Sequence, residues 1–133
     1  MVKVKAMGCL VLGVLACSCQ QTQSLPPQKG KNTREDVVAS LQETGVDTKS
    51  PVQFELYLKF KSQSDAEAAA NELRSHCQSV ETYPEPVEKT WVCKGRKLLV
   101  PDSDETEYVL YRAKESASAH HGEFEAWEIN FGR

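Results

Sequence analysis

The sequence predicts an α+β domain over residues 33–133, and three observations support this prediction. Residues 52–60 alternate apolar and polar side chains, which is typical of a strand with one buried face. Residues 64–77 and 102–120 carry apolar side chains at helical spacing, and each stretch opens with a capping motif. Short apolar strands follow both stretches, so we expect one sheet with helices packed on it.

A short helix is expected to open the domain. Thr33 can cap it, Glu35 and Asp36 lie in its first turn near the positive end of the helix dipole, and Gly45 ends it. Its apolar side consists of Val37, Val38 and Leu41. Because so short a helix is unstable alone, we expect it to dock on the rest of the domain.

The clearest strand and the helix after it come next. The strand places five apolar side chains on one face: Val52, Phe54, Leu56, Leu58 and Phe60. Ser64 and Glu67 form a capping box for the helix, whose apolar stripe consists of Ala66, Ala69, Ala70, Leu73 and Cys77. The small alanines allow this helix to lie close to the sheet.

Two further strands, a helix and a last strand complete the domain. Residues 80–83 form a short edge strand before the turn Pro84-Glu-Pro86, and residues 88–100 form a longer strand with a bulge at Gly95. Asp102 and Glu105 cap a helix that runs to about residue 120. The last strand covers residues 123–131 and has Trp127, Ile129 and Phe131 on one side.

After the first helix, the order is strand, helix, strand, strand, helix, strand. This is the split βαβ arrangement called ferredoxin-like. We therefore expect a four-stranded antiparallel sheet with two helices on one face, plus the short N-terminal helix.

The N-terminus indicates export. Lys3 and Lys5 precede an apolar run over residues 6–16, which is too short to span a bilayer stably. Val14-Leu-Ala-Cys17 resembles the bacterial lipobox, in which the chain is cut before the cysteine and the thiol is acylated. We expect residues 1–16 to be a signal peptide and Cys17 to carry the lipid, and Cys19 is the alternative acylation site.

Residues 17–32 read as a lipidated, disordered tether, because they are mostly polar, lack aromatic side chains and contain Pro26-Pro27. The residue after the acylated cysteine is Ser18, and not the aspartate associated with inner-membrane retention in enteric bacteria. The sequence therefore predicts a lipid anchor in the outer membrane, with the domain facing the periplasm or the outside.

The cysteines and the net charge indicate the redox state of the domain and the class of partner. Export implies an oxidising compartment, so we expect Cys77 and Cys93 to form a disulfide, and two buried thiols are the alternative. The net charge of −3 becomes −5 when the signal peptide removes Lys3 and Lys5. An anionic domain without a basic stripe repels a phosphate backbone, so no nucleic-acid partner is expected.

No catalytic signature stands out, and we expect no catalytic residue and no cofactor. One group of side chains contains candidate metal ligands, since imidazole and carboxylate suit zinc or copper: His120, His121, Glu123 and Glu125. Adjacent histidines usually point apart, however, and His76 is the only other histidine. We therefore expect no metal site, and a metal-binding envelope protein is kept as an alternative.

The segment Gly122-Glu-Phe-Glu-Ala-Trp127 resembles the signature of the regulator of ribonuclease activity B family, the protein inhibitors of ribonuclease E. That signature reads Gly-Glu-Tyr-Asp-Gly-Trp, and Gly122, Glu123 and Trp127 match it. The resemblance extends over residues 33–132. It implies a ferredoxin-like fold and a role in binding and masking another protein, without chemistry of its own.

Together these observations predict a membrane-anchored lipoprotein whose non-catalytic domain binds and regulates an envelope protein. The expected contact surface is the outward face of the sheet around Tyr57 and Lys59, or the C-terminal segment with Gly122, Glu123, Phe124, Glu125 and Trp127. Burial is the competing interpretation of Trp91 and Trp127. The alternative function is a cytoplasmic regulator of ribonuclease E, which requires that the N-terminus is not a signal peptide.

Overall fold

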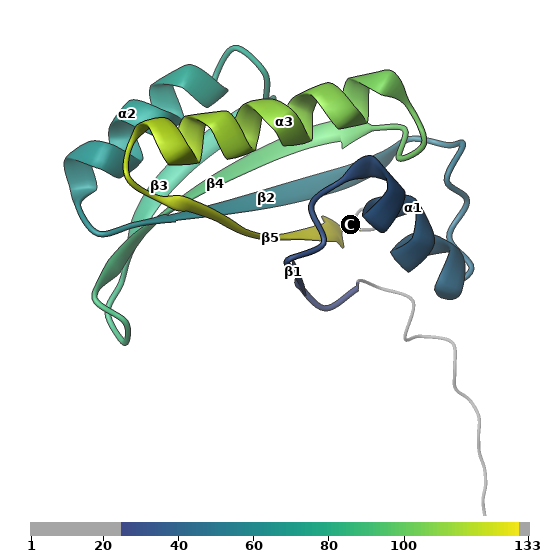
Figure 1. Ribbon diagram of the computed structural model, residues 1–133, viewed down its shortest axis with the longest axis horizontal. Coiled ribbons are helices and arrows are strands. Elements are labelled where there is room, and N and C mark those ends of the chain that lie inside the picture. The colour runs from purple at the N-terminus through teal and green to yellow at the C-terminus, as the bar shows by residue number, and fades with distance from the viewer. Residues whose placement is uncertain (1–24, 131–133) are drawn as a thin grey trace, which may run out of the picture.

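A computed structural model of the chain describes residues 25–130 (Figure 1). The predicted signal peptide, the candidate acylation sites Cys17 and Cys19, the first part of the tether and Phe131 lie outside the described residues. None of the helices in residues 25–130 is long and apolar enough to cross a membrane.

Residues 25–130 form three helices and five strands. Their bounds are β1 Gln28–Lys29, α1 Arg34–Glu43, β2 Val52–Phe60, α2 Gln63–Leu73, β3 Ser79–Glu85, β4 Thr90–Leu99, α3 Asp104–Ala119 and β5 Glu123–Asn130. All strand pairs are antiparallel, and the order across the sheet is β1-β5-β2-β4-β3. The α+β prediction is confirmed, whereas the four-stranded, ferredoxin-like description agrees only roughly because β1 adds a fifth strand.

Strand β1 lies inside the segment that was expected to be a disordered tether. Gln28 pairs with Trp127 and Lys29 pairs with Ala126. The indole Nε1 of Trp127 also donates a hydrogen bond to the backbone oxygen of Lys31. The structure therefore differs from the prediction for residues 25–32, which are held against the edge of β5.

Helices α2 and α3 lie on the same face of the sheet and enclose the core with it (Figure 1). The alanine stripe of α2 and four of the five apolar side chains of β2 are buried, as their periodicity predicts, and Val52 at the start of β2 is partly buried. Helix α1 docks by inserting Val37 and Leu41, both 0% exposed, into the same core. The predicted docking of this helix on the domain is confirmed.

The helix starts correct two of the three predicted caps. Thr33 caps α1 as expected and accepts a hydrogen bond from the Asp36 amide at 3.1 Å. Ser62 and not Ser64 caps α2, because it lies in extended conformation directly before the first helical residue. Ser103 caps α3 for the same reason, while Asp102 is hydrogen-bonded to Lys49 at 2.8 Å.

The predicted bulge at Gly95 is wrong, because β2 and β4 pair there without a register shift. A Cβ at Gly95 would lie 2.9 Å from the Cys77 sulfur, so this glycine makes room for Cys77. The sheet irregularity lies instead in β5, where Ala126 pairs with Tyr57 but Phe124 pairs with Leu58. The extra residue is Glu125, and the shift lets Phe124 pack against the core.

Candidate protein-binding surface

The face of the sheet opposite α2 and α3 is the candidate site, and we call it the open face. It carries the side chains that alternate with the core residues of the strands. We define it by Glu81 and Tyr83 of β3, Val92, Lys94 and Arg96 of β4, Glu55, Tyr57 and Lys59 of β2, and Glu125, Ala126 and Glu128 of β5.

Glu55 lies at the centre of the open face and is only 3% exposed. Its carboxylate accepts hydrogen bonds from Arg96 Nε at 2.9 Å and from the Tyr57 hydroxyl at 3.1 Å, and Lys94 Nζ lies 3.6 Å away. Burial by itself raises the pKa of Glu55, but Lys94 and these hydrogen bonds outweigh it and lower the pKa below its usual value. Glu55 is therefore an ionised, fully paired carboxylate that ties β2 to β4.

Lys59 organises a second charged group on the same face. Its ammonium group pairs with Glu88 of the β3–β4 hairpin and with Glu125 at 2.9 Å. Lys29 of β1 reaches the same carboxylate of Glu125 at 3.6 Å. Hydrogen bonds to Glu88 and then Glu125 raise the pKa of Lys59, so it stays charged.

Two tyrosines flank a hollow of about 350 Å³ on the open face. Tyr57 is partly buried and has Lys94 Nζ 5.7 Å above its ring centroid, while Tyr83 is 36% exposed. Burial, Glu128 and Glu55 raise the pKa of Tyr57, so its hydroxyl remains a donor at neutral pH. Tyrosine is among the side chains that protein interfaces favour.

Three residues of the C-terminal segment that was predicted to bind a partner are packed within the domain. Trp127 is 0% exposed and packs on Phe54, with ring centroids 5.7 Å apart. Phe124 packs against the core, and Gly122 lies so close to β2 that a Cβ would be 2.5 Å from the Lys59 carbonyl oxygen. Burial is thus confirmed for Trp127.

Of the remaining members of that segment, Glu125 belongs to the open face through its ion pair with Lys59. Glu123 is exposed and lines a separate hollow of about 240 Å³ with Lys61 and His121. Glu55, Lys94 and Arg96 were not named from the sequence as site residues. The alternation within β2 and β4 could have identified them, because it places their side chains on the same face as Tyr57 and Lys59.

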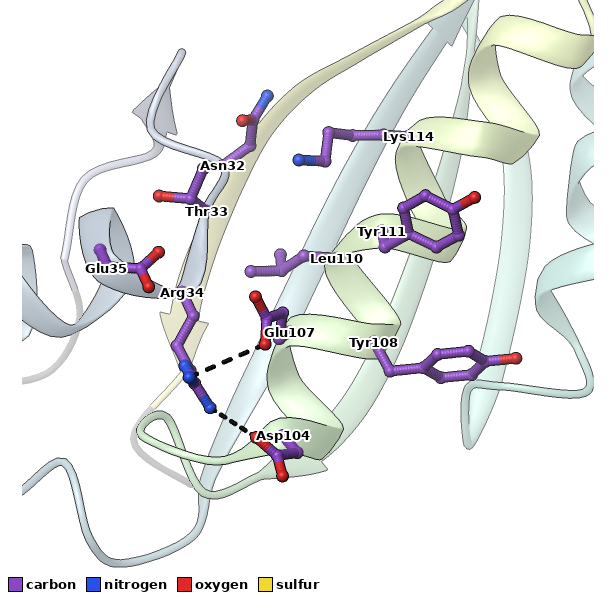
Figure 2. A pocket seen from close by; sticks show the side chains of 10 residues that line it. All are labelled: Asn32, Thr33, Arg34, Glu35, Asp104, Glu107, Tyr108, Leu110, Tyr111 and Lys114. Carbon is purple, nitrogen blue, oxygen red and sulfur yellow. Dashed lines mark hydrogen bonds and ion pairs between the residues drawn. The ribbon is translucent and has the colours of Figure 1, made fainter.

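A third and larger hollow, of about 420 Å³, lies between the start of α1 and the outer side of α3 (Figure 2). Arg34 fills part of it and pairs with Asp104 at 2.8 Å and with Glu107 at 3.7 Å. These pairs clasp α1 to α3. Tyr108 and Tyr111 are about half exposed, and Figure 2 shows their rings pointing away from α1.

The cysteines and histidines were the other candidate site residues. Cys77 and Cys93 are free thiols, and burial raises the pKa of Cys77 to about 11 and that of Cys93 to about 12. Their disulfide stays a prediction for the exported protein.

His120 contacts Glu72 at 2.8 Å and His121 lies 3.8 Å from Asp65, so the adjacent histidines point apart. Over residues 25–130, no three His, Cys, Asp or Glu side chains converge as metal ligands.

The fold and the open face define an α+β domain with a polar, aromatic surface suited to binding protein. Comparison with known families agrees with this class. The model of the family described as regulator of ribonuclease activity B matches residues 31–129, so the chain belongs to this family. Its members regulate ribonuclease E by binding it and are not themselves enzymes. No curated protein and no solved structure matches the chain significantly.

Proposed function

We propose that this chain is a lipid-anchored, non-catalytic regulator that binds its protein partner through the open face of the sheet. The observation that carries the proposal is the contrast between the two faces of the sheet. One face is buried under α2 and α3, while the other carries paired charges and two tyrosines that no helix of the described residues covers. A regulator that acts by binding needs such an exposed, rigid surface.

The ion pairs of the open face also prepare it for binding. Lys59, Lys94 and Glu55 are each held by two or more partners from neighbouring strands or the β3–β4 turn, so little side-chain freedom is left to lose on association. Membership of a family that regulates by binding supports the same function.

The identity of the partner depends on the compartment. The lipobox-like run ending at Cys17 favours export, acylation and an envelope partner, whereas family membership favours ribonuclease E, which is cytoplasmic. We expect labelled palmitate to enter the wild-type chain in outer-membrane fractions and to be lost in Cys17→Ala but kept in Cys19→Ala. An unlabelled, soluble cytoplasmic protein would overturn the anchor and make ribonuclease E the proposed partner.

No observation favours the metal-binding alternative, because His120 and His121 contact different carboxylates.

The contact surface is tested by affinity purification of the full chain from cells. Leu98 lies at the margin of the open face and is 48% exposed, so Leu98→Asp leaves the core intact and adds a charge to the contact. Tyr111→Asp is the matched control on α3, where the side chain is 51% exposed. We expect a stoichiometric partner with wild type and Tyr111→Asp but not with Leu98→Asp. The reverse pattern would place the contact on the helix side.

A further inference from the structure

The hollow between Tyr57 and Tyr83 combines an apolar floor with an acidic rim. Val92 and Ala126, 7% and 5% exposed, form its floor. The rim carries Glu85, Glu125 and Glu128, and among the described residues the only cation that lines it is Lys29.

The charges around this hollow are unbalanced. Lys59 and Lys29 both pair with Glu125, at 2.9 Å and 3.6 Å, whereas neither Glu85 nor Glu128 takes part in an ion pair of the described residues. Burial and the neighbouring Glu55 raise the pKa of Glu128, and the Tyr57 hydroxyl and Lys94 offset only part of this rise. A positive charge placed in the hollow would relieve this repulsion between carboxylates.

The aromatic rings add a second feature that attracts cations. Lys94 already lies 5.7 Å from the ring centroid of Tyr57, so this region of the open face accommodates a cation against an aromatic ring. Burial and four carboxylates raise the pKa of Tyr83: Glu81, Glu128, Glu55 and Glu125. Tyrosine faces beside carboxylates match a planar guanidinium, which stacks on rings and pairs with oxygen atoms in its plane.

We propose that this hollow receives an arginine side chain from the partner protein. The inference rests on the proposed function, since it takes the open face to be the contact surface. It adds the chemistry of the partner: a basic segment whose arginine enters between Tyr57 and Tyr83 and pairs with Glu85 and Glu128.

The test uses N-acetyl-arginine methylamide as the probe and N-acetyl-norleucine methylamide as the neutral control. Amide signals of the isotope-labelled full chain in detergent are followed by NMR during titration. We expect the arginine probe to shift the signals of Tyr57, Tyr83 and Glu128 in a saturable way, and the norleucine probe to leave them in place. Equal shifts with both probes, or shifts that do not saturate, would overturn the proposal.

Variants separate this inference from the proposed function. The double substitution Glu85→Gln with Glu128→Gln is expected to raise the Kd of the arginine probe about fivefold or more, because it removes two partly buried ion pairs. Glu115→Gln, on an exposed position of α3, is the matched control and should leave the Kd unchanged. An unchanged Kd in the double variant would refute the arginine site. If wild type still recovered the partner in the affinity purification and Leu98→Asp did not, the proposed function would stand without the arginine site.

Discussion

Replacing Gly122 with alanine tests whether this residue of the family signature is required by packing. The new Cβ would lie 2.5 Å from the Lys59 carbonyl oxygen and 2.5 Å from Phe60 Cε1. Real Cβ atoms essentially never approach other atoms within 3.0 Å, so a neighbour must move. The Lys59 oxygen belongs to β2, which is paired with β4 and β5 on its two sides and has little room to shift.

The size of the effect follows from these contacts. Overpacking costs about 1–3 kcal/mol, and a backbone neighbour in a central strand puts Gly122→Ala near about 3 kcal/mol. Gly45→Ala is the matched control, because Gly45 has nothing within 4 Å of its added Cβ and differs only in its φ of +79°. A left-handed backbone costs an alanine about 1 kcal/mol.

Thermal unfolding followed by circular dichroism measures the difference. For a domain of this size we expect Tm to fall by about 12–24 °C in Gly122→Ala and by about 4–8 °C in Gly45→Ala. A Gly122→Ala variant as stable as wild type would refute the packing explanation. Gly122 would then return to the candidate partner-binding residues.

Three further predictions follow from the buried and charged groups. Trp127→Phe keeps a ring beside Phe54 but leaves the Lys31 carbonyl oxygen without its donor. We expect the free energy of unfolding in urea to fall by about 1–2 kcal/mol. An unchanged free energy of unfolding would show that the indole does not hold the β1 segment. The fold lowers the pKa of Glu55, so this carboxylate stabilises the protein fully above the ordinary glutamate pKa of 4.5 and loses its contribution as the pH falls through the lowered value. The free energy of unfolding should therefore drop more steeply with acid in wild type than in Glu55→Gln. Equal acid dependence of the two proteins would contradict the ion-pair network around Glu55. Burial raises the pKa of Cys77 to about 11 and that of Cys93 to about 12, so iodoacetamide at pH 8 should label neither thiol in the folded chain. Rapid labelling of both thiols would count against their burial. Labelling in urea that occurs only after a reductant is added would reveal the predicted disulfide.

Periodicity made most of the fold predictable. The alternation in residues 52–60 and the alanine stripe of α2 fix which side chains face the core, and all of these except the partly buried Val52 are buried as expected. Thr33 was identifiable as a cap because it stands directly before an acidic first turn. The same alternation placed Tyr57 and Lys59 on the outward face, and the structure adds the partners that hold them.

The remaining features depend on contacts that local sequence does not encode. Strand β1 has only two residues, so its pairing with Trp127 and Ala126 leaves no periodic signal. The shift at Glu125 arises where β5 meets β2, and no glycine marks it. Without that shift, simple alternation would direct Phe124 outward and Glu125 inward.

The most direct test of the open face as the contact surface is site-specific photo-crosslinking in living cells. The photoreactive phenylalanine analogue p-benzoylphenylalanine is placed at Tyr83 on the open face or at Tyr111 on α3, in otherwise unchanged full chains. We expect one covalent adduct of defined mass from position 83 and none from position 111. An adduct from position 111 alone would contradict the account, because the partner would then contact the helices and not the open face.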